Sequence, residues 1–376
     1  MPPPCVGTTD LDPKGIGVAP LSPPIRTISI RSMTLSQEKK ALVDASAATT
    51  APGKILMDCA GAHIGGAKRF LDELDRYLAT RMPVHLDLIG RGGYLTPRWL
   101  LRRELGLAGQ DRSIALNNVA FSRRGRERWV LLRNALHFLT ADEARELGDG
   151  MSRQVHLQVP VVRWTAARAD VLVAPTSAMA ERVTRLIPEV TGRIVVRLHP
   201  ASPRSEAHTP RDATILCPVI FSRYKRMTER LRLIVDAAEI VARAGVPLRV
   251  IATATAQDVG DANLCQSPYL RLVGPQSTQE VQALAARAAA LLYPTRLESF
   301  GYPLAEARVN RQPVVAMDTA QNREVAGDAL IGYERETAEE LATAMLTAMQ
   351  TRLPQTPVPE LNPIRYFDWL LGVTTK

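Results

Sequence analysis

The chain has 376 residues, and 47 Lys and Arg against 38 Asp and Glu give it a formal net charge of +9. This length exceeds what one compact core usually holds, so two domains are expected. No run of eighteen apolar residues occurs, which excludes a membrane-spanning helix, and no secretory signal opens the chain. The sequence therefore predicts a cytosolic protein, and its positive charge favours an anionic partner such as phosphate, nucleic acid or acidic lipid.

The four cysteines are scattered through the sequence, with no CxxC pair and no histidine at metal-binding spacing. They are Cys5, Cys59, Cys217 and Cys265. This pattern predicts ordinary reduced thiols rather than a disulfide framework or a zinc site.

Residues 1–52 are rich in Pro, Ser, Thr and Ala and have no sustained periodicity. Such a segment buries too little apolar surface to offset the entropy of ordering, so a disordered tail is predicted. Residues 53–202 then alternate short apolar runs with helical patterns, which is typical of a parallel sheet covered by helices. Strands are expected within 54–61, 84–90, 129–134, 169–175 and 193–198.

A polar, proline-bearing segment at 201–212 is typical of an interdomain linker, and a second α/β series follows it. We predict one domain over 53–202 and another over 203–376, the latter ending in an amphipathic helix at 363–373. In the second series, strands are expected within 213–220, 248–254, 269–274, 291–295 and 313–318, and helices within 227–245, 278–290, 303–310 and 337–349.

The chemistry is expected after the strand at 291–295, where the sequence continues RLESFGYPLAEA. Glu298 falls at the turn from strand to helix and Glu306 lies eight residues later. Gly301 lets the backbone approach a ligand closely, and the free N–H groups at a helix start attract phosphate. Eight helical residues rise about 12 Å, the scale that separates the sugar of a nucleotide sugar from its ribose.

This string resembles the E-x7-E signature of retaining glycosyltransferase family four, whose members have the GT-B fold of two facing Rossmann-like domains. Residues 212–350 resemble the family throughout. The resemblance implies that Glu306 contacts the ribose hydroxyls and Glu298 the transferred sugar. It also implies that the distal phosphate and nearby hydroxyls meet the backbone of Phe300 and Gly301, with Ser299 beside them.

Basic residues must neutralise the leaving nucleoside diphosphate, and IFSRYKRM supplies Arg223, Lys225 and Arg226 after the first strand of this domain. The run resembles the Arg and Lys pair of the family with a shorter spacing. Glu298, Arg223 and Lys225 are assigned to catalysis and Arg226 to donor binding. Both Lys225 and Arg226 are candidates for the lysine role. A solvated basic face is the alternative.

In the first domain, CAGAHIGGAKRF resembles the early glycine-rich loop of the family, with Gly65 and Gly66 as the matching pair and His63 beside them. The alternative is close packing of strand and helix. The family also places a histidine after a central strand. Here Arg133 and Asn134 occupy that place, and His137 lies three residues on as either a displaced equivalent or a structural histidine.

The resemblance implies transfer of a sugar from a nucleotide-sugar donor to a saccharide, lipid-linked or small-molecule hydroxyl acceptor, with retention of the anomer and without a cofactor. A non-catalytic sugar-nucleotide binder and a GT-B-fold epimerase are the alternatives. A glycoside hydrolase is disfavoured, because its two carboxylates normally come from separate elements around a sugar groove. A nucleic-acid-binding protein is disfavoured, because the sequence has no nucleic-acid-binding pattern. No DxD-like motif stands out, so a metal-independent reaction is predicted.

Two segments of the first domain, 97–105 and 122–129, combine Arg with Trp and Leu. Peripheral contact with an anionic, cytoplasmic membrane face is one interpretation. The competing one is that long Arg side chains cover apolar surface while their charged heads remain solvated.

Overall fold

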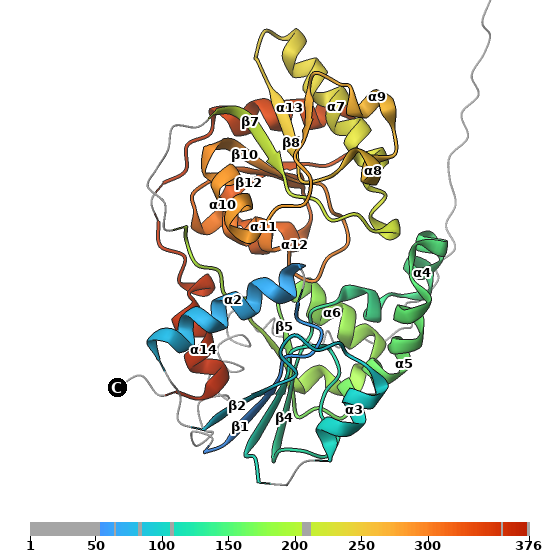
Figure 1. The fold of residues 1–376 in the computed structure, drawn as a ribbon, viewed down its shortest axis with the longest axis vertical. Helices are drawn as coiled ribbons and strands as arrows, with labels where there is room; N and C mark the ends of the chain where they lie inside the picture. Colours follow the sequence, from blue (N-terminus) through green and yellow to red (C-terminus); the bar gives the residue numbers. More distant parts are fainter. Residues whose placement is uncertain are drawn as a thin grey trace, which may run out of the picture. The chain divides into compact units, whose positions relative to one another are not determined.

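The protein was analysed as a computed structural model that describes residues 53–63, 65–81, 85–105, 109–204, 212–354 and 356–373. The predicted tail, residues 1–52, lies outside this part of the chain. The described residues form two six-stranded parallel sheets with helices packed against them, which confirms the α/β class (Figure 1). We refer to residues 53–204 as the first half and to residues 212–354 as the second half.

The first sheet has the strand order β2-β1-β3-β4-β5-β6, with every neighbouring pair parallel. Because helices cover both faces, its central strands are buried on both sides, as in β1, where all four residues are buried. The strands are β1 Ile55–Asp58, β2 Leu86–Ile89, β3 Arg112–Ala115, β4 Glu127–Leu131, β5 Val171–Ala174 and β6 Ile194–Val196.

The second sheet has the order β12-β11-β10-β7-β8-β9, also parallel throughout. Its first strand β7 lies beside β10, the point where the strand order reverses, as in a doubly wound fold. The strands are β7 Asp212–Cys217, β8 Arg249–Ala252, β9 Leu270–Leu272, β10 Ala288–Tyr293, β11 Val314–Met317 and β12 Leu330–Tyr333.

The α-helices connect these strands and carry most of the amphipathic faces (Figure 1). In the first half they are α2 Gly65–Thr80, α3 Pro97–Glu104, α4 Ala141–Leu147, α5 Arg153–Ala166 and α6 Ser177–Leu186. In the second half they are α7 Met227–Arg243, α8 Ala256–Val259, α9 Ala262–Cys265, α10 Thr278–Arg287, α11 Tyr302–Val309, α12 Ala320–Ala326 and α13 Ala338–Gln350, and α14 Pro363–Leu371 follows.

Three of the differences from the expected elements concern strands. Two strands, β3 and β12, were not expected, because Arg and Ser open one and Gly interrupts the other. The alanines 288–290 were expected to end a helix, but α10 stops at Arg287 and they begin β10. Their pairing with β7 outweighs the helix propensity of alanine.

The terminal helix α14 forms as predicted, and it packs on α2 of the first half, beside which it lies in Figure 1. The Tyr77 hydroxyl donates to Asp368 at 2.8 Å, and Arg81 forms an ion pair with the same carboxylate at 2.8 Å. Arg112 of β3 donates to the carbonyl of Leu370 at 3.0 Å. The chain therefore returns to the first half after completing the second sheet.

A buried ion pair holds the carboxyl end of β1. The side chains of Asp58 and Arg103 are 0% and 1% exposed, and Arg103 Nη1 donates to Asp58 at 2.5 Å. Asp58 also accepts from Trp99 and Asn117, and Arg103 donates to two backbone carbonyls, at residues 119 and 120. With these additional bonds most polar atoms of the pair are satisfied, while Arg103 Nε has no hydrogen-bond partner among the described residues. Removing one residue of the pair would leave a buried charge unmatched.

We predict that Arg103→Ala lowers the free energy of unfolding by about 3–5 kcal/mol, because it leaves the buried Asp58 carboxylate without its counter-charge. Arg102→Ala is the matched control, since Arg102 is an exposed neighbour on the same helix; a change within about 0.5 kcal/mol is expected there. Urea unfolding of both variants measures the difference. Equal stabilities of the two variants would contradict this account.

Candidate functional site

The central feature of the site is an ion pair where β7 and β10 end. Lys225 follows β7 in a short 3-10 turn, Glu298 follows β10, and Lys225 Nζ donates to Glu298 Oε1 at 2.6 Å. The carboxyl ends of parallel strands meet at one edge of a sheet, and the reversal of strand order opens a crevice there. Two residues 73 positions apart are thus brought together.

The protonation of this pair follows from its surroundings. Burial alone would lower the pKa of Lys225, but the Glu298 carboxylate and the neighbouring Tyr224 outweigh burial and hold that pKa above its ordinary value. Lys225 is therefore a cation at neutral pH and can bind an anionic ligand once Glu298 turns to another partner.

Helix α11 begins beside the pair. Gly301 precedes it with φ of +91°, a left-handed conformation that disfavours other residues, and an added Cβ would lie 3.0 Å from a side-chain atom of Leu304. Pro303 occupies the first turn, where it costs no hydrogen bond. Pro303 has no N–H, and the N–H of Leu304 donates to the Gly301 carbonyl at 3.0 Å. An anion at the helix start would therefore meet the N–H groups before Pro303, where the helix dipole favours negative charge.

Ser299 links the two halves at this point. Its hydroxyl donates to the carbonyl of Arg133 at 2.7 Å, and its own carbonyl accepts from the Thr176 hydroxyl at 3.1 Å. Ser177, next along the chain, binds the carboxylate of Glu324 through its backbone N–H and its hydroxyl. The loop that carries Glu298 is therefore fixed to the first half through the hydroxyl and the carbonyl of Ser299.

Between the halves lies a cavity of about 180 Å³. Its lining includes six predicted site residues: Gly66, Lys225, Glu298, Ser299, Phe300 and Gly301. Tyr302 also lines it, with its ring centroid 5.1 Å from that of Phe300.

Glu306 lies further along α11, outside the cavity lining, and its carboxylate forms an ion pair within the protein. Arg69 of α2 lies 3.1 Å from its carboxylate, so the residue expected at the ribose faces the first half. Burial raises the pKa of Glu306 above its ordinary value, and Arg69 opposes that rise. A hydroxyl ligand at Glu306 would have to share the carboxylate with Arg69 or displace it.

The other two predicted basic residues differ from Lys225. Arg223 and Arg226 are exposed, and neither belongs to the cavity lining. Arg226 lies 3.5 Å from Glu229 on the outer side of α7. The structure thus brings Lys225, rather than Arg226, to the carboxylate.

The glycine pair opens α2 beside the cavity. Gly65 has φ of +55°, and a Cβ on Gly66 would lie 3.1 Å from the Tyr302 ring. Gly66 thus allows α2 to approach α11 closely, which is a packing role within the cavity wall. His63 lies edge-on to Tyr94 at 4.7 Å and is not part of the lining.

His137 is also away from the cavity. It is buried in a 3-10 turn with one ring nitrogen 2.9 Å from Asn118 and the other 3.1 Å from Gln158. Burial lowers its pKa, so the ring is neutral at pH 7. Asn118 in turn accepts from the backbone N–H of Arg133, so His137 supports the loop that carries Arg133.

Two basic residues of the cavity lining were not assigned a role from the sequence. Arg133 donates to the carbonyl of Gly66 at 2.6 Å and lies 4.8 Å from the Phe70 ring centroid. His199, after β6, lies 5.2 Å from Phe300, and burial together with Arg133 holds its pKa well below the ordinary value. The sequence signal for both was weak: each is one polar residue just past a short strand.

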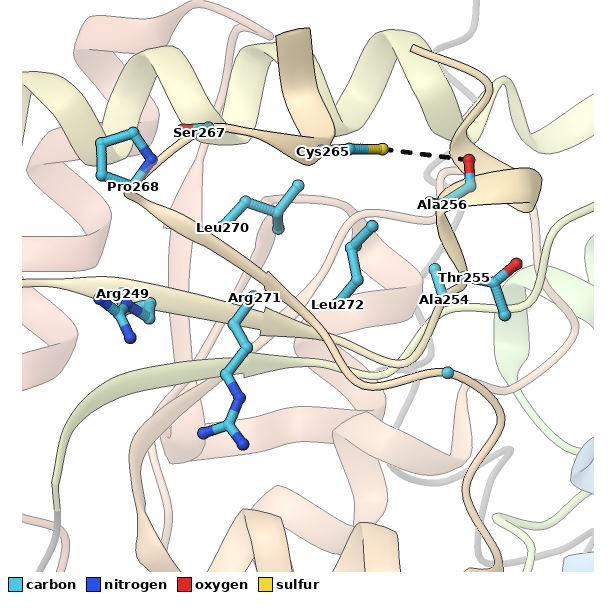
Figure 2. Close-up of a pocket in the computed structure, with 11 residues that line it drawn as sticks. Arg249, Ala254, Thr255, Ala256, Cys265, Ser267, Pro268, Leu270, Arg271 and Leu272 are labelled. Carbon is cyan, nitrogen blue, oxygen red and sulfur yellow. Dashed lines mark hydrogen bonds between the residues drawn. The ribbon is translucent and has the colours of Figure 1, made fainter. Parts of the chain in front are cut away.

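A larger cavity of about 520 Å³ lies along β8 and β9 (Figure 2). Arg249 and Arg271 on its wall are exposed, and Cys265 makes a long contact of 3.9 Å with the carbonyl of Ala256. None of the predicted site residues lines it. The smaller cavity is the candidate site because polar side chains from both halves converge on it.

Within the described ranges, Cys59, Cys217 and Cys265 are free thiols, and no group of three His, Cys, Asp or Glu side chains could hold a metal ion. The same residues contain no helix of sufficient length and apolarity to span a bilayer.

Two doubly wound parallel sheets joined through a polar cavity at their strand ends define the GT-B fold. Residues 218–351 match the family model of glycosyl transferases group 1. No curated protein matches the chain. The matched segment holds Lys225, Glu298 and Glu306.

Solved structures are similar in fold. WaaG, a glycosyltransferase involved in lipopolysaccharide biosynthesis, has a TM-score of 0.53 at 14% identity, over 84% of this chain and 95% of WaaG. A point mutant of S. aureus TarM has a TM-score of 0.46 at 14% identity, over 64% of this chain and 48% of TarM. The chain thus spans about half the length of TarM. The likeness to WaaG shows the fold alone.

We predict that stability falls as the pH is lowered from about 7.5 to about 5.5. His137 and His199 have depressed pKa values in the folded state, so the unfolded chain binds protons more readily below about pH 6.5. Each contributes at most about 1.4 kcal/mol per pH unit, and the contribution is fully present above that pH. Urea unfolding at both pH values tests this, with His199→Asn expected to show a shallower dependence. An unchanged dependence in that variant would be the contrary result.

Proposed function

We propose that the protein is a glycosyltransferase that moves a sugar from a nucleotide-sugar donor to a hydroxyl acceptor. The observation that carries this proposal is the Lys225–Glu298 pair beside the start of α11, within the segment that matches glycosyl transferases group 1. A cation and a helix start suit the diphosphate, and a carboxylate suits sugar hydroxyls.

The donor is proposed to lie along α11. Its distal phosphate meets Lys225 and the first N–H groups of the helix, its sugar meets Glu298, and its ribose meets Glu306. Arg223 and Arg226 are proposed to add positive charge outside the cavity and to assist phosphate binding from solvent. The nucleotide sugar is a substrate here, and no separate cofactor is proposed.

Donor binding is proposed to open the cavity. Its volume, about 180 Å³, is below the roughly 300–1,000 Å³ of typical ligand pockets. Glu306 and Glu298 are both engaged by cations, Arg69 and Lys225 respectively. A donor replaces these internal contacts with hydroxyl and phosphate groups, which separates α2 from α11.

The reaction is proposed to retain the anomeric configuration by front-side attack, with the departing phosphate accepting the acceptor proton. Glu298, the carboxylate in the cavity lining, is engaged by Lys225, so no unpaired carboxylate among the lining residues is placed to take that proton. The lysine and the helix start stabilise the diphosphate electrostatically as it leaves, so the reaction is proposed to need no metal ion.

Donor turnover with an acceptor library tests the function. We expect nucleoside diphosphate release that depends on an acceptor and continues in EDTA, with a retained anomer by NMR. Glu306→Ala should weaken donor binding by ~1.5–3 kcal/mol, the loss of a charged hydrogen bond. Glu339→Ala on an exposed turn of α13 is the control and should bind as the wild type does.

The other outcomes separate the competing functions. Release of an epimerised nucleotide sugar without an acceptor would indicate an epimerase, and tight binding without turnover would indicate a non-catalytic binder. An inverted product would refute the proposed stereochemistry. Equal donor affinity in Glu306→Ala would remove Glu306 from the site.

We also propose that the acceptor is linked to a lipid and that the protein reaches it by binding to the membrane surface. Helix α3 exposes Leu101 and, just beyond its end, Leu105, at 70% and 83%, and Arg98 and Arg102 are exposed on the same helix. The second candidate segment, 122–129, is less suited, because Arg128 there is bound by both oxygens of Asp170. The membrane contact is therefore assigned to α3.

Co-sedimentation with anionic and neutral vesicles, at low and physiological salt, measures this contact. We expect salt-sensitive binding to anionic vesicles that Leu101→Ser combined with Leu105→Ser abolishes. Leu157→Ser on α5, where Leu157 is 78% exposed, is the matched control and should bind normally. Equal, negligible binding to both vesicle types would leave a water-soluble acceptor.

A further inference from the structure

The wall of the site cavity contains three buried polar atoms with no hydrogen-bond partner among the described residues. They are Nη1 of Arg133, Nε2 of His199 and the hydroxyl of Tyr302. Arg133 follows β4, His199 follows β6 and Tyr302 opens α11, so three segments distant in sequence contribute them. Buried donors without acceptors cost stability, and such groups converging on one cavity indicate a binding site for an acceptor.

These side chains are held in place by packing. The rings of His199 and Tyr302 stack with centroids 6.3 Å apart and an interplanar angle of 16°, and Phe300 lies edge-on to both. Arg133 is anchored at Gly66 and over the Phe70 ring. The three polar groups are therefore preorganised and need little reordering to bind.

The two cations of the cavity lining differ in their partners. The charge of Lys225 is compensated by Glu298 at 2.6 Å, whereas Arg133 contacts the neutral carbonyl of Gly66 and the ring of Phe70. Among the lining residues, the charged side chains are Arg133, Lys225 and Glu298. The cavity thus holds one cation in excess, with its Nη1 buried, and such a cation is stable only beside a counter-charge.

We propose that Arg133, His199 and Tyr302 form an oxyanion subsite that binds a carboxylate or phosphate carried by the transferred sugar or by the acceptor. The proposal rests on the proposed function and names its substrate class, an acidic sugar or an acidic acceptor. Arg133 supplies the charge, and His199 and Tyr302 supply neutral hydrogen bonds. The donor diphosphate is assigned to Lys225 and α11, which lie on the second half.

Ligand-induced shifts of the unfolding temperature test the subsite directly. The probes are glucuronate, glucose 6-phosphate, inorganic phosphate and glucose, each with the wild type and with Arg133→Gln. We expect acidic probes to stabilise the wild type at concentrations where glucose does not, with at least tenfold weaker binding to Arg133→Gln. Comparing the shifts with glucuronate and with glucose 6-phosphate shows whether the subsite prefers a carboxylate or a phosphate. Inorganic phosphate shows whether a phosphate binds without a sugar attached.

Two further measurements separate this proposal from the function on which it rests. Nucleoside diphosphate affinity should change less than threefold in Arg133→Gln, and Arg168→Gln, an exposed arginine over Trp164, should behave as the wild type throughout. Arg133→Lys keeps the charge and should retain part of the acidic-probe binding even if Arg133→Gln folds poorly.

The contrary results are distinct. Equal shifts of the unfolding temperature with glucose and glucuronate would overturn the proposed subsite. A tenfold loss of nucleoside diphosphate affinity in Arg133→Gln would also overturn it, because that result would assign Arg133 to the donor phosphates. Absence of any nucleoside diphosphate binding to the wild type would refute the proposed function instead. Binding of inorganic phosphate alone, undiminished in Arg133→Gln, would also overturn the subsite.

Discussion

The geometry of the site depends on the hydrogen bonds that Ser299 makes to the first half. Its hydroxyl binds the carbonyl of Arg133, and its carbonyl binds the hydroxyl of Thr176. Through these two bonds the loop after β10 is tied to the loops after β4 and β5. Glu298 on one side and Phe300 on the other are placed by the same residue, so the carboxylate and the aromatic wall of the cavity are positioned together.

The candidate site is also a closed arrangement of opposite charges. Lys225 and Arg69 each engage a carboxylate that the proposed function needs for a sugar hydroxyl. Such internal pairs satisfy the charges of the site. Exchanging them for substrate contacts, as the proposed function requires, would have a modest net cost, because hydrogen bonds would replace hydrogen bonds. The two pairs differ in which halves they connect. Lys225 and Glu298 both belong to the second half, whereas the pair of Arg69 and Glu306 joins the two halves.

The sequence best predicted the part of the site in which one motif spans a strand and the helix that follows it. The segment from Glu298 to Glu306 could be placed on a strand end and a helix start, because glycine and proline mark the turn and the apolar run marks the strand. Lys225 could be found in the same way, from a basic cluster after the first strand of the second half. Both fold class and this part of the site follow from local patterns.

The residues contributed by the first half could not be derived in this way. Arg69, Arg133 and His199 become site residues only because of how two loops and one helix pack, and nothing local distinguishes them from solvated or structural residues. His137 shows the converse: its spacing made it a candidate, but the surrounding amides hold it in a structural role. The strand β3 was missed because its register with β1, rather than its composition, makes it a strand.

The position of α14 affects how the molecule can move. Because this helix packs on α2, the chain passes between the halves twice, once after β6 and once after α13. Two covalent connections restrain a relative rotation far more than one does, and they favour a hinge whose axis runs close to both crossings. Opening of the site is thereby confined to one principal direction. A protein cut after α13 would lose both that restraint and the cover over the apolar face of α2, so the packing of the first half depends on the last helix of the chain.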